Sequence, residues 1–255
     1  MKILNCFKVI EDLDKMTKDD WQIAGRLFVD TSFIKTMLNE SDASAIELAL
    51  RLRDDSDGET NVYGITITDK KVRSFIKQLY GLKYDEVAVC NSKGEDLRFR
   101  PDIISRIIAD YAIDIEADII TFGSNAPNGN NFLTPFYAAE ILDMKCVSNV
   151  IDVRKINDQE LMITQQGDIG MVKIKVSLPI VLIVENAPGT TLRIPTLKDK
   201  MQGSKKEVYE IDMDSCKVSS INVMKPVKLS PIDNSRNHEV IKKEELIQLI
   251  GGSGQ

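Results

Sequence analysis

A cluster of short polar residues at positions 123–131 is the strongest candidate in this chain for ligand chemistry. The segment reads GSNAPNGNN, with two Gly, four Asn and one Ser, and it directly precedes a predicted helix. Exposed backbone amides, small side chains and a helix N-terminus are what an anion such as phosphate requires. A flexible turn is the alternative, because Asn and Gly are favoured wherever φ is positive. Neither G-x-G-x-x-G nor a P-loop motif occurs in the chain.

Acid–base, nucleophilic and metal chemistry lack the residues that they need. The sequence has one His, His238, and four Cys without any C-x-x-C spacing, at Cys6, Cys90, Cys146 and Cys216. A Ser-His-Asp triad, a His-rich metal site and a structural zinc site are therefore disfavoured. We interpret the cysteines as buried small residues in a reducing cytosol, and we expect His238 to be solvated.

A lysine-bearing stretch at 191–206 is the second candidate, for contact with another protein. Leu197 and Met201 would be apolar side chains on a polar segment. They either dock on the body of this domain, which is the commoner outcome, or insert into a partner as apolar anchors. The surrounding residues 186–233 contain several Pro and no strong periodicity, which is typical of an arm, lid or linker.

Alternating strands and helices must position these candidates. Apolar runs predict strands at 2–10, 61–68, 85–90, 119–122 and 146–153, and helical spacing predicts helices at 41–53, 71–82, 101–112 and 134–142. Ser41 or Asp42 is expected to cap the first helix. This order predicts an α/β fold with a parallel sheet, which binds ligands at the carboxyl ends of its strands. The polar loop at 123–131 would lie at that edge.

The pattern changes after residue 153. A last amphipathic helix is predicted at 240–250, and the terminal GGSGQ is predicted to be a disordered end. Three strand-like stretches without intervening helices predict an antiparallel extension on the edge of the sheet, at 160–165, 172–177 and 180–184. We therefore divide the chain into an α/β domain with edge strands, an arm, and a C-terminal helix with its tail, at 1–185, 186–233 and 234–255.

The composition excludes several classes of protein. With 43% hydrophobic and 28% charged residues among 255, the chain has the profile of a globular protein with a sizeable core. A net charge of −6 disfavours a uniformly basic nucleic-acid binder. No apolar run approaches the ~20 residues that span a bilayer, and the first residues show no signal-peptide pattern. We expect a soluble, cytoplasmic protein that binds neither nucleic acid nor membrane.

Four stretches, in this order, resemble the beta subunit of electron transfer flavoprotein. They are MKILNCFKV at 1–9, NESDASAIELAL at 39–50, GSNAPNGN at 123–130 and TLRIPTLKDKMQGSKK at 191–206. The family patterns for the second and third are Asn-Pro-x-(Asp/Glu)-x-x-Ala-(Ile/Val)-Glu-x-Ala-Leu and Gly-x-x-Ala-x-Asp-Gly-Asp. Each match is degraded, but four in the correct order are much more specific than any one. The resemblance runs nearly end to end.

The resemblance implies a parallel-sheet nucleotide-binding domain of the adenine nucleotide alpha hydrolase-like type, with an antiparallel edge extension and a C-terminal arm. It implies a heterodimer in which the alpha subunit makes most contacts to the electron-carrying FAD. The beta subunit would bind AMP, or a second FAD as in electron-bifurcating members. The chain would be an electron-carrier subunit rather than a stand-alone catalyst. Its partners would be the alpha subunit and a flavin-containing dehydrogenase of the acyl-CoA type.

The site residues follow from the same resemblance. Leu197 falls on the apolar anchor position that recognises the dehydrogenase, with Arg193 and Met201 beside it. No catalytic residue and no metal ligand is expected. The predicted nucleotide contacts are Cys6, Phe7, Lys8, Val9, Asn39, Ser41, Asp42, Gly123, Ser124, Asn125, Ala126, Asn128, Gly129, Asn130, Asn131 and Thr134.

Two departures from the family pattern bear on the nucleotide. The family's Asp-Gly-Asp-Thr-(Gly/Ala)-Gln-Val becomes NGNNFLT at 128–134, so Phe132 and Leu133 could fill part of the pocket. Glu40 replaces the family's Pro after Asn39. Two alternatives stay open. One is a structural subunit of a larger flavoenzyme complex that has lost its own nucleotide, and the other is an adenine-nucleotide-binding sensor module.

Overall fold

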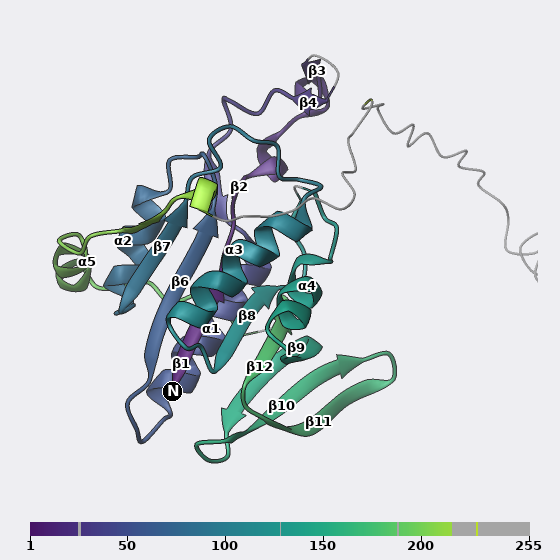
Figure 1. Cartoon of the computed structure of the whole chain (residues 1–255). Helices are drawn as coiled ribbons and strands as arrows, with labels where there is room; N and C mark the ends of the chain where they lie inside the picture. Colours follow the sequence, from purple (N-terminus) through teal and green to yellow (C-terminus); the bar gives the residue numbers. More distant parts are fainter. Residues whose placement is uncertain (25–26, 128, 188, 216–227, 229–255) are drawn as a thin grey trace, which may run out of the picture.

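The computed structural model describes residues 1–24, 27–127, 129–187, 189–215 and 228 of the chain. Within them, a nine-stranded sheet runs through the molecule (Figure 1). β10, the second strand from one edge, pairs antiparallel with β9 and β11, and the other neighbouring pairs are parallel. Its strands in spatial order are β11 (Gly170–Ser177), β10 (Glu160–Gly167), β9 (Lys145–Lys155), β12 (Ile180–Val184), β8 (Ile119–Gly123), β1 (Lys2–Cys6), β6 (Asn61–Ile67), β7 (Glu86–Cys90) and β13 (Tyr209–Ile211).

Helices cover both faces of this sheet, which confirms the α/β prediction. Two helices, α1 (Glu40–Asp54) and α2 (Arg73–Gly81), lie on one face, and α3 (Pro101–Asp114) and α4 (Thr134–Ile141) cross in front of the other (Figure 1). Successive residues of β1 serve the two layers, since Ile3 packs against α1 and Leu4 against α3. This double burial explains why the central strands are continuous apolar runs.

The first predicted strand, at 2–10, was too long. β1 ends at Cys6, and β2 (Val9–Glu11) pairs with β5 (Thr36–Leu38) in a separate two-stranded sheet. Val9 is nevertheless buried, because it packs among side chains of α1 and α2. The apolar sequence pattern therefore continues past the end of the strand, because the residues that follow are also buried. The intervening excursion contains η1 (Leu13–Lys15), η2 (Lys18–Asp20), β3 (Ile23–Ala24) and β4 (Phe28–Val29).

The antiparallel edge extension is confirmed for two of its three predicted strands. β10 and β11 form a hairpin outside β9, with Leu161 opposite Val176. The third strand, β12, was predicted on the edge and lies instead in the parallel part, between β8 and β9. Its five residues are all buried. A short apolar strand that is covered on both faces belongs in the centre of a sheet.

The predicted arm contributes regular structure of its own. α5 (Leu197–Gly203) packs against α2, and β13 extends the sheet beyond β7, followed by η3 (Met213–Ser215). Residues within 186–233 thus join the same sheet as residues 1–185. Several predictions lie outside the described residues: those for Asn128, Cys216, His238, the helix at 240–250 and the terminal GGSGQ. Among the residues that are described, no helix combines the length and apolar character that crossing a membrane requires.

Candidate nucleotide-binding site

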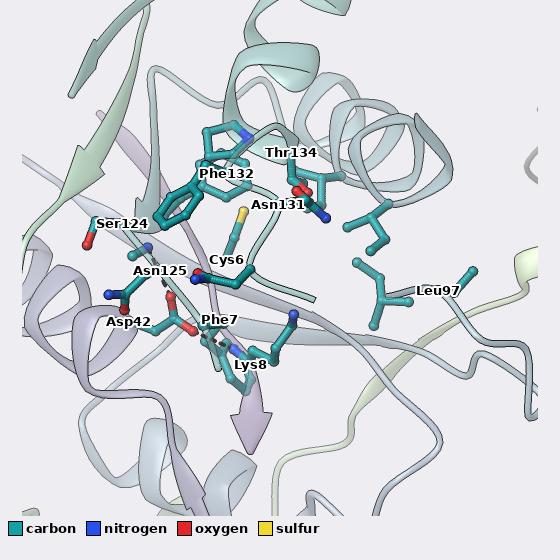
Figure 2. A pocket seen from close by; sticks show the side chains of 18 of the residues that line it. Cys6, Phe7, Lys8, Asp42, Leu97, Ser124, Asn125, Asn131, Phe132 and Thr134 are labelled. Carbon is teal, nitrogen blue, oxygen red and sulfur yellow. Dashed lines mark hydrogen bonds between the residues drawn. The ribbon is translucent and has the colours of Figure 1, made fainter. Parts of the chain in front are cut away.

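A pocket opens at the carboxyl ends of β1, β6 and β8, where the strand order reverses (Figure 2). Its cavity volume is about 130 Å³, below the roughly 300–1,000 Å³ typical of cofactor sites. The structure brings eleven of the sixteen predicted nucleotide contacts together in its wall: Cys6, Phe7, Lys8, Asp42, Gly123, Ser124, Asn125, Ala126, Asn130, Asn131 and Thr134.

Four of the remaining predicted contacts lie behind the wall, and Asn128 is outside the described residues. Val9 is buried in the core beside α1. Asn39 and Ser41 hold a loop from behind: Asn39 Nδ2 donates to the Asn125 carbonyl at 2.7 Å, and Ser41 Oγ contacts Asn125 Oδ1 at 3.2 Å. Their influence on a ligand would therefore be indirect.

The carboxylate of Asp42 joins the ends of β1 and β8, two of the three strand ends that form the pocket. Its Oδ2 accepts the backbone N–H of Lys8 at 2.8 Å, and its Oδ1 accepts that of Gly123 at 2.9 Å. Burial raises the pKa of Asp42 to about 6, against the opposing effect of these bonds and of the Lys8 charge. The capping prediction was wrong. Asn39 occupies the N-cap position of α1 without a side-chain cap bond, and Ser41 and Asp42 lie in the first turn.

Gly123 permits the close approach of β8 to the start of α1. A Cβ at this position would lie 2.6 Å from the backbone nitrogen of Asp42 and 2.7 Å from the carbonyl carbon of Ser41. Real Cβ atoms essentially never come this close to backbone. The loop after β8 is therefore locked to α1 by both hydrogen bonding and sterics.

The loop between β7 and α3 forms the opposite wall. Asn131 Nδ2 donates to the carbonyl of Arg98 at 3.2 Å. Gly129 has a φ of 83°, and a Cβ there would lie 2.6 Å from the same oxygen. The fourth residue behind the wall, Gly129, thus lets the polar loop reach Arg98. The left-handed backbone expected for this Asn- and Gly-rich loop occurs at Gly129, at Asn130 and also at Phe132.

Two cations line the pocket. Burial lowers the pKa of Lys8, and the nearby carboxylate of Asp42 opposes that change. The guanidinium of Arg98 pairs with Asp96 at 2.7 Å and lies 4.3 Å from the centre of the Phe28 ring. Positive side chains at the rim of a pocket suit phosphate oxygens. Sequence reasoning identified Lys8 but missed Arg98, because the loop that carries it has no motif.

The inner surface of the pocket is largely apolar, and sequence reasoning missed most of it. These side chains come from β6, from the loop before α3, from α3 and from β8, which only the sheet brings together. The end of β6 was a usable signal, since it marks the same sheet edge, but nothing in the α3 sequence distinguishes the lining residues from core. The missed lining residues are Ile65, Ile67, Leu97, Arg98, Ile104, Ile108, Phe122 and Pro135.

The start of α4 offers fewer free backbone N–H donors than a helix N-terminus that binds phosphate. Pro135 has no N–H, and the N–H of Leu133 donates to Asn131 Oδ1 at 3.0 Å. Phe132 does line the pocket, and Figure 2 shows its ring among the lining side chains. Leu133 does not line it. Of the two residues expected to fill part of the pocket, only Phe132 is placed to do so.

The predicted partner-binding residues divide into two kinds. Leu197 and Met201, on α5, are 77% and 64% exposed. Arg193 is turned toward its own domain, where its guanidinium pairs with Glu47 at 2.9 Å and also with Asp54. Leu197 and Met201 therefore do not dock on the part of the domain that the structure describes.

Other chemistries find no support in the site. Among the described residues, no group of three His, Cys, Asp or Glu side chains could hold a metal ion. Burial, followed by the nearby Asp42, raises the pKa of the Cys6 thiol well above its usual value, so this pocket cysteine is not an activated thiolate. Cys6 and Cys90 are buried and Cys146 is half-buried, in line with the interpretation of these residues as small core side chains.

The fold and the pocket together define a Rossmann-like α/β protein with a pocket at the switch point of its sheet. Over residues 27–215 the chain matches the electron transfer flavoprotein domain, and it belongs to that family.

Relatives with assigned names agree with this membership and point to the beta-type subunit. The chain is 28% identical to the putative electron transfer flavoprotein subunit YgcR of Escherichia coli, over 82% of this chain and 80% of that protein. It is 27% identical to electron transfer flavoprotein subunit beta of Bacillus subtilis, over 70% and 68%. It is 24% identical to the caffeyl-CoA reductase-Etf complex subunit CarD of Acetobacterium woodii, over 71% and 67%.

Proposed function

We propose that this chain is the beta-type subunit of an electron transfer flavoprotein, paired with an alpha-type subunit. The pair passes electrons between a flavin-containing dehydrogenase and a redox partner. The observation that carries the proposal is the pocket at the switch point of the sheet, in a chain of this family. The alpha subunit makes most of the contacts to the electron-carrying FAD, and the pocket of this chain binds AMP or a second FAD. Bound flavin supplies the redox chemistry, and this chain binds and orients the nucleotide.

The lining of the pocket supports a nucleotide as its occupant. Ile65, Ile104 and Phe122 provide an apolar surface for a flat heterocycle. The rim offers hydrogen-bonding groups on Ser124, Asn125 and Asn131, besides the positive charges of Lys8 and Arg98. Because Pro135 and the engaged N–H of Leu133 weaken the start of α4, we assign the phosphates to Lys8. The guanidinium of Arg98 is already held by Asp96 and by the carbonyl of Leu27.

Release and counting of bound nucleotides tests this half of the proposal. The chain is co-expressed with an alpha-type subunit, and the purified complex is denatured and assayed for FAD and AMP. Two FAD per complex support a second flavin in the pocket, and one FAD with one AMP supports the adenylate. A complex that carries flavin but no second nucleotide contradicts the pocket assignment and favours the structural-subunit alternative.

The exposed apolar side chains of α5 support docking to a dehydrogenase. CarD, by its name, is a subunit of a complex with a reductase of a CoA ester, which favours an acyl-CoA-type dehydrogenase as partner. Leu197 is the most exposed apolar residue of α5, and truncation of an anchor typically costs at least ~1–2 kcal/mol of binding. We therefore expect Leu197→Ala to raise the KM for the dehydrogenase ~10-fold, with bound nucleotide unchanged.

A matched control is available on the far hairpin. Ile169, between β10 and β11, is fully exposed, so Ile169→Ala removes similar apolar surface elsewhere. Equal kinetics for wild type and Ile169→Ala, with a higher KM for Leu197→Ala alone, support α5 as the docking site. Unchanged kinetics for Leu197→Ala contradict it.

A further inference from the structure

Arg193 attaches the start of the α5 segment, residues 193–204, to the middle of α1. Its backbone N–H donates to Glu47 Oε2 at 3.1 Å, its Nε donates to the same oxygen at 3.1 Å, and a terminal nitrogen donates to Glu47 Oε1 at 2.9 Å. The other terminal nitrogen contacts Asp54, about two turns further along α1. Glu47 is only 4% exposed, so this fork reaches into the protein rather than toward solvent.

Contacts with α2 and the residues after it hold the rest of the segment and the residues that follow it, from Pro195 to Lys206. Pro195 packs against Gly81 at the end of α2, where an added Cβ would lie 3.0 Å from Pro195 Cβ. At Gly203 an added Cβ would lie 2.6 Å from the carbonyl carbon of Tyr80. Beyond it, Lys206 Nζ donates to the carbonyl of Tyr84 at 2.7 Å. Two glycines therefore let α5 lie directly on the backbone of α2.

Between these attachments, the apolar side chains point outward. Ile194 is 81% exposed and follows Arg193 directly, and Leu197 and Met201 lie on α5. A seven-residue helix does not hold its own position in water, because helices this short are marginal. Its orientation on the domain must come from the residues that flank it.

We propose that Arg193 is a positioning residue, which sets the outward presentation of Ile194, Leu197 and Met201 through its ion pairs with Glu47 and Asp54, and does not itself contact the partner. This inference rests on the proposed docking function of α5. A direct contact would require the partner to withdraw the guanidinium from a buried carboxylate. Glu47 also pairs with Arg51 at 3.1 Å, and withdrawal of Arg193 would leave that single cation to neutralise the buried carboxylate, which is unfavourable.

A double-mutant cycle between Arg193 and Glu47 separates the two roles. We expect Arg193→Gln and Glu47→Gln each to raise the KM for the dehydrogenase about fivefold with kcat unchanged, as for the loss of one partly buried pair. The double variant should be no worse than either single variant, because both break the same attachment. Arg193→Lys keeps the charge without the fork and should fall between wild type and Arg193→Gln.

A direct partner contact gives a different pattern, which overturns the inference. Glu47→Gln would then leave KM unchanged or lower it, since it frees the guanidinium for the partner, and only Arg193→Gln would raise it. Arg154→Gln is the matched control, because Arg154 is an exposed arginine on β9 that pairs only with nearby Asp152 among the contacts described. It should leave KM unchanged.

Hydrogen exchange in the full-length chain without any dehydrogenase distinguishes failure of this inference from failure of the docking function. Arg193→Gln should speed amide exchange across residues 194–204 and leave α1 and the pocket loops as protected as in wild type. Unchanged exchange contradicts the positioning role whatever the kinetics. Faster exchange together with a KM that does not respond to Leu197→Ala supports the attachment and contradicts docking through α5.

Discussion

The pocket at the switch point and the α5 segment, residues 193–204, are both attached to α1, but by different kinds of contact. At the pocket, Asp42 uses its buried carboxylate on two backbone N–H groups, and Gly123 sits against the helix without room for a Cβ. At the segment, a half-exposed Arg193 reaches Glu47, and the helix that follows presents its apolar side chains to solvent. The contacts that hold the pocket lie in the protein interior, so we expect substitutions there to disturb the fold. The apolar side chains of the α5 segment face solvent and are not part of the core.

Substitution at Gly123 should give the largest effect. In Gly123→Ala the Cβ would meet the backbone of Asp42 and Ser41, which cannot yield without separating β8 from α1. We expect a loss of about 2–4 kcal/mol in the free energy of unfolding, together with loss of the pocket nucleotide. Urea unfolding and nucleotide release measure the two effects. Gly58→Ala is the control, because a Cβ there meets nothing within 4 Å. Equal stability of the two variants would refute the close contact.

Substitution at Gly203 should give a smaller and local effect. Gly203→Ala places a Cβ 2.6–2.7 Å from the backbone of Tyr80 and Gly81, so α5 must lift from α2. The free energy of unfolding should fall by about 1–2 kcal/mol, with faster amide exchange in α5 and a higher KM for the dehydrogenase. Nucleotide content should equal that of wild type. Loss of nucleotide in this variant would show that the two regions are not independent.

Replacement of Asp42 tests the inward organisation of the pocket by its pH dependence. The pKa of Asp42 is about 6 in the folded chain and about 3.9 when unfolded. The stabilising effect of its protonation is therefore complete below pH ~4 and is lost as pH rises to ~6. Asp42→Asn removes this titration.

The measurement is the free energy of urea unfolding of wild type and Asp42→Asn across pH 4–8. The difference between the two should change between pH 4 and 6, by about 1–3 kcal/mol, and stay constant above pH 7. Taking the difference cancels the many surface carboxylates that titrate in both proteins. A difference that is independent of pH would contradict the burial of this carboxyl group.

Truncation of the exposed α5 side chains should give the smallest effect on stability. Leu197 and Met201 are largely solvent-exposed in the isolated chain, so Leu197→Ala and Met201→Ala should change the free energy of unfolding by less than about 0.5 kcal/mol. Thermal or urea unfolding checks this. A loss of 2 kcal/mol or more would mean that these side chains pack on their own domain, and the contrast with the pocket would disappear.

The polar half of the pocket was open to prediction because it lies in one continuous stretch. Residues 123–134 combine small polar side chains with a strand end, and that local pattern has a physical meaning at a sheet edge. The apolar half was not predictable. Ile104 and Ile108 follow the helical spacing of ordinary core residues, and Arg98 lies in a loop without a motif. Their approach to the pocket depends on how α3 and the loop before it pack over the sheet.

The sequence alone determined the α/β fold and the strand edge at which the pocket lies. These follow from periodicity and composition, which are local properties of the chain. Only the tertiary structure decided the central place of β12, the bridging role of Asp42 and the inward direction of Arg193. Each of these depends on which distant segment meets a residue across the fold. Arg193 lies 146 residues from Glu47, and no pattern within either segment records that contact.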